Sequence, residues 1–174
     1  MIKNVFLISD THFGHASILK FFRRDGSTKV RHFADVDEMN EAMVENWNRV
    51  VKPTDKVYHL GDVVIPRKAL SFVKRLNGEK ILIKGNHDMY PLKDYLPYFR
   101  DIRSSHVLDG MILTHIPVHE SSLIRFGINV HGHTHTDRVM KDNVIDTRYF
   151  SVSVEHIDYT PIELGDLRKR ITGG

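Results

Sequence analysis

Cysteine is absent from the chain, and its absence excludes several kinds of site at once. Without thiols there is no disulfide framework, no thiolate nucleophile and no zinc site of the cysteine type. A chain without cysteine is also typical of a reducing compartment, and we expect a cytoplasmic protein.

Long apolar runs are absent as well. The run near the start of the chain ends at Ser9 and Asp10, and no later run approaches its length. A signal peptide needs an apolar region of roughly 7–15 residues, and a membrane-spanning helix needs about 20. We therefore expect neither, and no interaction with a membrane.

What the chain does contain is ordinary for a globular protein, since 41% of its 174 residues are hydrophobic and 27% are charged. This length is about that of one domain. No repeat, low-complexity tract or linker divides it, so a single domain is expected over residues 1–174. The formal net charge of +3 fits an anionic substrate, and equally a solvated surface of mixed charge.

The first half of the chain alternates between patterns typical of strands and of helices. Continuous apolar runs predict buried strands at Val5–Ile8, Lys56–Leu60 and Lys80–Lys84. Between them, helices are predicted over Ala16–Phe22, from the N-cap Asp35 with its reciprocal partner Glu38 to Pro53, and over Arg67–Leu76. Arg23–Arg31 is polar and reads as a loop. This alternation predicts an α/β domain with at least partly parallel strands.

The second half predicts short strands. Asp109-Gly110 separates Ser105–Leu108 from Met111–Thr114, which is a strong hairpin signal. Further strands are expected at Ile128–Val130, Val144–Asp146 and Ser151–Val154, and a last helix over about Ile162–Arg170. This number of strands fits two sheets covered by outer helices.

Polar side chains directly follow five of the predicted strands. The stretches are Asp10-Thr11-His12, Gly61-Asp62, Gly85-Asn86-His87-Asp88, His115 and His131-Gly132-His133-Thr134-His135. Ligands of α/β sheets bind beyond the carboxyl ends of the strands. We therefore expect the five stretches to meet at one edge of the fold.

The residue types in these stretches suit metal ions. Asp10 and His12 lie two positions apart, as do His133 and His135, so in an extended segment each pair would point to one side. Carboxylate, imidazole and amide donors without sulfur favour manganese, iron, zinc or nickel. The donors exceed the need of one ion, which predicts two ions that share a carboxylate, an arrangement suited to phosphoryl chemistry.

Each stretch alone has an ordinary alternative. Asp-x-His and Gly-Asp occur in many turns, and His-x-His occurs on surfaces. The set is specific because every member follows a predicted strand, in a consistent order.

Taken together, the stretches resemble the calcineurin-like metallophosphoesterase superfamily, whose blocks read D-x-H, G-D, G-N-H-[DE], H and G-H-x-H. The match covers residues 10 to 135, and the segment from Ser151 to Ile162 is similar as well. The resemblance implies a four-layer α/β/β/α sandwich of two mixed sheets, with a dimetal site at the edge where the strands end.

The resemblance also implies a role for each donor. Asp10, His12 and His135 would hold the first ion, Asn86, His115 and His133 the second, and Asp62 would bridge both. Manganese is expected first, with iron, zinc or nickel as alternatives, and a bridging hydroxide would attack phosphorus. His87 would stay off the metals and protonate or stabilise the leaving alkoxide.

Departures from the family narrow the expected activity. Many members carry G-D-x-x-D followed by an arginine, but here Ile65 and Pro66 take those places and Arg67 comes one residue later. The protein-phosphatase site is therefore not expected. The chain looks closest to the small bacterial and phage-type phosphoesterases, so we expect hydrolysis of a phosphodiester in a nucleotide or another small phosphoester.

Alternatives to that activity remain. A phosphomonoesterase fits the same site, and a non-catalytic scaffold of the same fold fits it less well. Nucleic acid as substrate is compatible with the charge, but no aromatic–basic stacking motif supports it. The oligomeric state is not readable from the sequence.

A few residues outside the expected ligand set also deserve assignment: His15, His119, His131, Arg23 and Arg125. The histidines either support ligands, touch substrate or are hydrogen-bonded loop residues, and we assign none of them to a metal. The arginines have the geometry to clamp phosphate, although an exposed arginine is the favoured alternative. His59 is expected in the core.

Overall fold

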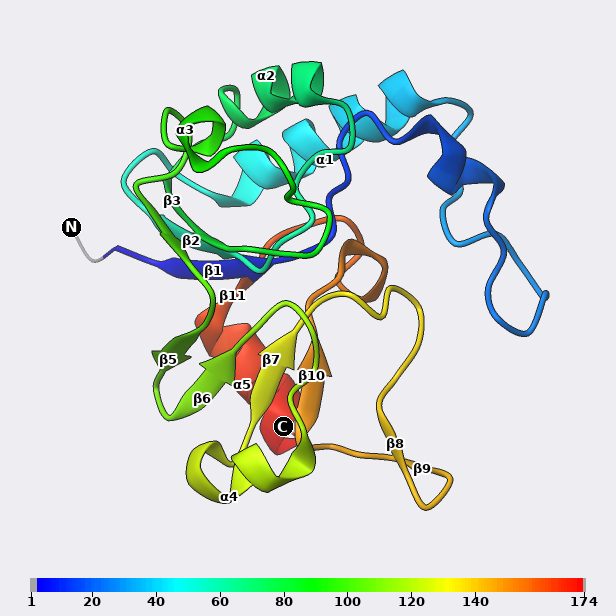
Figure 1. Cartoon of the computed structure of the whole chain (residues 1–174), viewed down its shortest axis with the longest axis vertical. Helices are drawn as coiled ribbons and strands as arrows, with labels where there is room; N and C mark the ends of the chain where they lie inside the picture. The colour runs from blue at the N-terminus through cyan, green and yellow to red at the C-terminus, as the bar shows by residue number, and fades with distance from the viewer. Residues whose placement is uncertain (1–2, 174) are drawn as a thin grey trace.

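A computed structural model of the chain describes residues 3–173 as two stacked sheets with helices on the outside (Figure 1). The first sheet has the order β11-β1-β2-β3-β4 and the second has the order β10-β7-β6-β5. Helices α1, α2 and α3 cover the outer face of the first sheet, and α4 lies beside the second (Figure 1), whereas α5 contacts β1 and β11 of the first sheet. The predicted α/β sandwich with two mixed sheets is confirmed.

The strands of the first sheet run mostly in one direction. Its members are β1 (Val5–Ile8), β2 (Lys56–His59), β3 (Glu79–Ile83), β4 (Asp101–Arg103) and β11 (Ile162–Glu163). The first four are parallel, and β11 is antiparallel to β1. The carboxyl ends of β1, β2 and β3 therefore lie at one edge.

The second sheet is shorter. It contains β5 (His106–Leu108), β6 (Met111–Leu113), β7 (Asn129–His131) and β10 (Tyr149–Ser151). Strand β7 is parallel to both of its neighbours, whereas β5 and β6 form the predicted hairpin. Asp109 and Gly110 at its turn both have positive φ, 50° and 81°, as a two-residue turn of this hand requires.

The helices are α1 (Val36–Val50), α2 (Leu70–Val73), α3 (Leu92–Tyr95), α4 (Leu123–Phe126) and α5 (Leu164–Thr172). The carboxylate of Asp35 caps α1 by accepting hydrogen bonds from the amides of Asp37 and Glu38, each of 2.9 Å. Glu38 reaches back to the amide of Ala34 rather than to that of Asp35, one residue further than predicted. Within residues 3–173, no helix has the length and apolar character that a membrane crossing requires.

The core lies between α1 and the first sheet and continues between the two sheets. Met39, Met43 and Trp47 form the buried stripe of α1, and each is at most 1% exposed. The indole of Trp47 donates a hydrogen bond of 3.0 Å to the carbonyl of Asn77, which ties α1 to the turn before β3. This packing holds the strands whose ends carry the polar stretches.

Two of the predicted helices have different bounds in the structure. The prediction over Arg67–Leu76 was too long, because a 3₁₀ turn at Arg67–Ala69 precedes α2 and the α-helix ends at Val73. The last helix begins at Leu164, not Ile162, because Ile162 pairs with Leu7 in β11 and β1. Pairing with a buried strand outweighs the helical periodicity of this segment.

The predicted strands near the C-terminus also shift. Strand β10 ends at Ser151, and the chain then forms a 3₁₀ turn at Val154–His156 instead of extending the strand through Val154. The predicted strand at Val144–Asp146 is β9 (Val144–Ile145), which pairs with β8 (Met140–Lys141) in a two-stranded hairpin outside both sheets. Likewise, the predicted helix at Ala16–Phe22 is a 3₁₀ turn at Ala16–Lys20.

Candidate metal centre

The five polar stretches come together at the edge where the strands end. Asp10 lies two residues past β1, Asp62 three past β2, and Asn86 three past β3. From the second sheet, His115 follows β6 and His133 follows β7. The two sheets join at this edge, since the amide of Ser9 donates to the carbonyl of Val152 over 2.9 Å.

Six of the predicted ligands form two compact groups. The first is Asp10, His12 and His135, and the second is Asp62, His115 and His133. Within each group one side-chain donor atom per residue lies within 4.8 Å of the others. Asn86, the remaining predicted ligand, adjoins the second group, with its Oδ1 2.9 Å from Nε2 of His115.

The carboxylate of Asp62, a member of the second group, also reaches His12 of the first group. Its Oδ2 is 3.6 Å from Nε2 of His12 and 3.2 Å from Nε2 of His115. Burial opposes ionisation of this group, but hydrogen bonds from His115 and from the backbone of His87 bring the pKa of Asp62 to about 2. An ionised, shared carboxylate is the arrangement that two neighbouring cations require.

The backbone at the ligands is unusual. Positive φ angles occur at five of them: 59° at Asp10, 47° at His12, 57° at Asp62, 69° at His133 and 48° at His135. Such angles are uncommon outside glycine and gather at functional sites. The extended backbone predicted for the pairs Asp10/His12 and His133/His135 is therefore wrong. Asp10 and His12 share one group, whereas His133 and His135 belong to different groups.

Two glycines permit the loops to approach one another. A Cβ on Gly85 would collide with Oδ1 of Asp62, and a Cβ on Gly132 would collide with Oγ of Ser9 and Oδ2 of Asp10. Any side chain at either position would displace a candidate ligand. Glycine, which has no Cβ, is the residue that permits such a close approach.

The donor set fits divalent metal ions. His12 is only 2% exposed, and neither of its buried ring nitrogens has a hydrogen-bond partner. Burial, together with the nearby Arg31 guanidinium, lowers the pKa of His12 well below its usual value, so the ring is neutral. An unpaired buried imidazole is costly, and a cation at the first group would supply the missing partner.

A buried ion pair behind the first group was not anticipated from the sequence. Arg31 is fully buried, and its Nε donates to Oε1 of Glu155 over 2.8 Å. Its Nη atoms donate to the carbonyls of Asp10 and Thr11 over 2.5 and 2.9 Å. Glu155 also contacts Nδ1 of His135, at 3.0 Å. Arg31 lies in the segment predicted to be a loop, so no sequence pattern marked it as part of the site. Glu155 could have been found from the sequence, because it directly follows the predicted strand Ser151–Val154, just as the other polar stretches follow their strands.

Asp88 is a second residue whose role only the structure explains. Its buried carboxylate accepts hydrogen bonds from the amides of Asp62 and Gly85, both of 2.8 Å, and from that of Val63, at 3.0 Å. These bonds fix the loop after β2 to the loop after β3. The last position of Gly85-Asn86-His87-Asp88 thus supports Asp62 from behind.

His87 and His15 lie beside the first group without belonging to it. The ring of His87 is exposed, and its centroid is 5.4 Å from that of His12. The ring of His15 is 5.5 Å from the same ring. Both rings therefore adjoin the ring of His12.

Other singled-out residues lie elsewhere. His59 is buried and contacts the Thr11 hydroxyl at 3.0 Å, as expected of a core residue. His131 is buried in β7, and its burial lowers its pKa to about 4. Its Nδ1 forms a hydrogen bond with the carbonyl of Gly132. His119 accepts a bond from the amide of Ser121 at the start of a turn, and Arg125 lies over the ring of Phe126 on α4.

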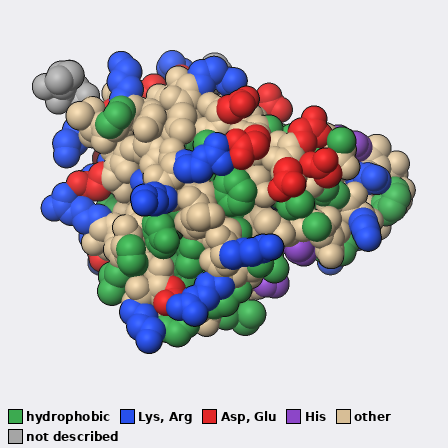
Figure 2. Space-filling model, turned by 90° about the horizontal axis from the view of Figure 1, so that it is seen from above, with side chains coloured by type: hydrophobic (Ala, Val, Ile, Leu, Met, Phe, Trp, Pro, Cys, Tyr) green, Lys and Arg blue, Asp and Glu red, His purple; other side chains and the backbone are tan. Residues whose placement is uncertain are grey.

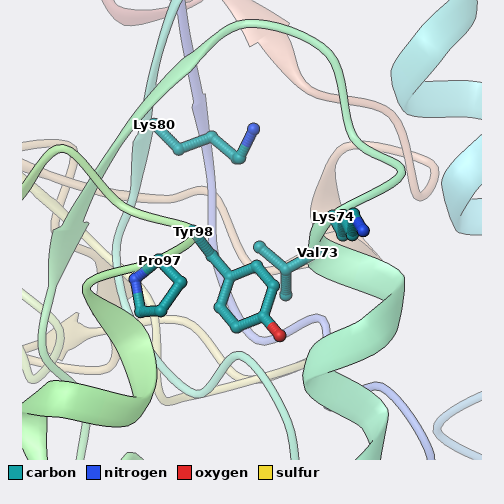
Figure 3. A pocket seen from close by; sticks show the side chains of 5 residues that line it. All are labelled: Val73, Lys74, Lys80, Pro97 and Tyr98. Atoms are coloured by element: carbon teal, nitrogen blue, oxygen red, sulfur yellow. The ribbon is translucent and has the colours of Figure 1, made fainter.

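A surface pocket at the opposite end of β3 is lined by Val73, Lys74, Lys80, Pro97 and Tyr98 (Figure 3). The ammonium of Lys80 already donates to the carbonyls of Leu76 and Gly78, over 2.7 and 3.0 Å. None of the candidate metal ligands lines this pocket.

Fold and site together define an α/β-sandwich protein with two adjacent groups of potential metal ligands. The chain belongs to the family of the uncharacterized protein MJ1445 of Methanocaldococcus jannaschii, with which it is 36% identical over 179 aligned residues. The alignment covers 99% of this chain and 94% of that protein. No protein-family model matches the chain.

Two further similarities extend to a phage and to a solved structure. The gene 66 protein of Mycobacterium phage L5 is 28% identical over 148 residues, which are 78% of this chain and 61% of the phage protein. The crystal structure of the protein of unknown function AQ665 from Aquifex aeolicus superposes with a TM-score of 0.69 at 26% identity, over 97% of this chain and 99% of that one. The whole fold is thus shared with a solved structure.

Proposed function

We propose that this protein is a metal-dependent phosphoesterase that holds two divalent cations, manganese foremost, with iron, zinc or nickel as alternatives. The observation that carries the proposal is the position of Asp62, whose Oδ2 lies within 3.6 Å of a histidine from each ligand group. Asp10, His12 and His135 would hold one ion, and Asn86, His115 and His133 the other. Asp62 would serve both.

The charges of the centre favour an anionic substrate. Bound cations would neutralise phosphate oxygens and acidify water between them. Asp10 and Asp62, the two carboxylates among the proposed ligands, offset only half the charge of two divalent ions. The remaining positive charge would stabilise the extra negative charge of a phosphoryl transition state.

We assign His87 to the leaving group. Its ring is exposed and lies 5.4 Å from that of His12, so it can meet a substrate that sits on the ligand groups. Its amide donates to Oδ1 of Asp62 over 2.8 Å, which fixes the position of its backbone. Protonated, the imidazole would donate its proton to the departing alkoxide.

A phosphodiester is the proposed substrate in preference to a monoester. Asn86, His87 and His133 are all exposed, so the centre is open in front of the second group. An open site leaves room for both substituents of a diester. A monoesterase uses the same ligands, and the two activities are separated by comparing substrates.

The test is hydrolysis of bis-(p-nitrophenyl) phosphate and of p-nitrophenyl phosphate with each of the four metals. We expect cleavage of both, faster for the diester, and none after chelation. His87→Ala should lose most of the activity while it retains both ions by calorimetry. Asp62→Ala should lose metal as well. His32→Ala, an exposed histidine outside the centre, is the matched control.

Several results would count against this function. Failure to cleave either ester with any of the four metals, in a protein that binds them, would favour a non-catalytic scaffold. Full activity of His87→Ala would remove that residue from the reaction. Faster cleavage of the monoester would reverse the substrate preference.

A further inference from the structure

An arm formed by residues 21–30 projects from the body of the molecule (Figure 1). It is held together by its own backbone, since the amide of Val30 donates to the carbonyl of Phe21 and that of Arg23 to the carbonyl of Thr28, both over 2.8 Å. A bridge also joins Phe22 to Lys29. The arm is therefore a narrow loop of defined shape.

The arm exposes aromatic and basic side chains together, a combination that the sequence-based expectation of no aromatic–basic stacking motif had missed. Phe21 is 50% exposed and Phe22 is 60% exposed, whereas aromatic residues such as Phe13 and Phe99 are buried. The exposed basic residues of segment 20–30 are Lys20, Arg23, Arg24 and Lys29, and its single acid is Asp25. Figure 2 shows hydrophobic and basic side chains at the narrow right-hand end of the molecule, where the arm lies.

Contacts connect the arm to the candidate metal centre on two sides. The ring of Phe21 is 5.7 Å from that of His15, which in turn faces His12. Nε of Arg24 is 3.9 Å from Oδ2 of Asp137, two residues beyond His135. A shallow cleft between the arm and this loop is lined by Arg23, Arg24, Asp25, Thr136 and Asp137.

We infer that the arm binds the nucleoside part of a nucleotide phosphodiester, which rests on the function proposed above. A base would stack on the exposed phenyl rings, and the neighbouring phosphate would lie in the cleft against the two arginines. Stacking on an aromatic ring is tolerant of base identity and contributes about 1–3 kcal/mol for each base. Guanidinium groups pair with phosphate oxygens in a bidentate manner.

The test compares two diesters that share a leaving group. One is the p-nitrophenyl ester of thymidine 5′-monophosphate, and the other is bis-(p-nitrophenyl) phosphate. The paired variant Phe21→Ala/Phe22→Ala should lower kcat/KM for the nucleotide ester about 5- to 100-fold and change the other less than about twofold. Ile124→Ala, at 91% exposure on α4, is the matched control for a lost surface hydrophobe.

Binding without catalysis tests the arm separately from the reaction. We expect a fluorescent single-stranded thymidine 12-mer to bind the metal-free protein, and Arg23→Ala/Arg24→Ala to weaken that binding and its salt dependence. Arg125→Ala is the control. Equal loss for both esters in the phenylalanine variant, or no oligonucleotide binding, would overturn the inference. If neither ester is cleaved but the 12-mer binds through the arm, the proposed function fails and the arm surface stands.

A second inference concerns the buried ion pair behind the first ligand group. We propose that Arg31 and Glu155 are positioning residues for the first cation. Glu155 holds Nδ1 of His135 at 3.0 Å, so Nε2 would be the atom of that ring that binds the cation. Arg31 holds the backbone of Asp10 and Thr11 through their carbonyls. One ion pair thus fixes both the loop that carries Asp10 and the loop that carries His135.

Titration calorimetry with manganese tests this role without any reaction. Glu155→Gln should weaken one of the two binding events about 10- to 100-fold and leave the other unchanged, because the second group has no contact with the pair. Glu41→Gln, whose partner Arg75 is on the surface, is the control. If Glu155→Gln does not fold, Glu155→Asp is measured with the same expectation. Equal weakening of both events, or of neither, would refute the positioning role.

Discussion

Replacing Asp88 by alanine should separate the loop that carries Asp62 from the loop that carries Gly85. The carboxylate is 1% exposed and accepts three backbone hydrogen bonds. Two of them, from Asp62 and Gly85, go to Oδ2, and the third, from Val63, goes to Oδ1. No other atom of the side chain takes part.

The expected loss in the free energy of unfolding follows from these hydrogen bonds. Each buried amide left without an acceptor costs about 1–3 kcal/mol. Three such amides give a ceiling of roughly 9 kcal/mol, and water that enters the vacated space lowers it, so we expect about 3–5 kcal/mol for Asp88→Ala. Asp88→Asn keeps one carbonyl oxygen, which can retain the two bonds of Oδ2. Burial raises the pKa of Asp88, which shows that the charged carboxylate is costly to bury, and a neutral amide is easier to bury there. We therefore expect Asp88→Asn to lower the free energy of unfolding by about 1–2 kcal/mol.

Urea unfolding of the metal-free protein, followed by the fluorescence of Trp47, measures both variants. Glu45→Ala on the exposed side of α1 is the control. The reasoning would be refuted if Asp88→Ala cost less than about 1 kcal/mol, or if the asparagine variant were as unstable as the alanine variant. Manganese binding should fall in the same order as stability, because both loops carry ligands.

Three other predictions concern the same region. Gly132→Ala should destabilise the fold by about 1–3 kcal/mol and weaken manganese binding, because its Cβ would displace Asp10; an unaffected calorimetric titration would contradict the clash. Although burial opposes ionisation of Glu155, Arg31 and His135 lower its pKa to about 2, so its stabilising effect is complete above its unfolded value of 4.5 and is lost as pH falls toward 2. The stability gap between wild type and Glu155→Gln should therefore narrow in acid unfolding curves. Finally, manganese at 100 times the Kd of one site should add about 2.7 kcal/mol of stability from that site, a rise in Tm that a chelator reverses; an unchanged Tm would exclude binding to the folded state.

Local patterns along the chain were enough for much of the architecture. The buried stripe of Met39, Met43 and Trp47, the cap at Asp35 and the turn at Asp109-Gly110 each depend on neighbours in sequence, so their structures followed from spacing. The sequence also predicted that the five polar stretches would meet at one edge of the fold. Parallel strands place their carboxyl ends at one edge, whatever the details of the loops.

Contacts between distant segments decided the rest. Ile162 forms a strand because it reaches Leu7, not because of its own neighbours. The left-handed backbone of the ligand loops arises where both sheets and two glycines crowd together, which no local pattern reports. Glu155 and Arg31 lie 124 positions apart and become partners only when the chain is folded. The sequence by itself determined which donors are available and at which edge they gather, whereas their grouping, their support and the arm beside them required the tertiary structure, because those properties depend on residues far apart in the chain.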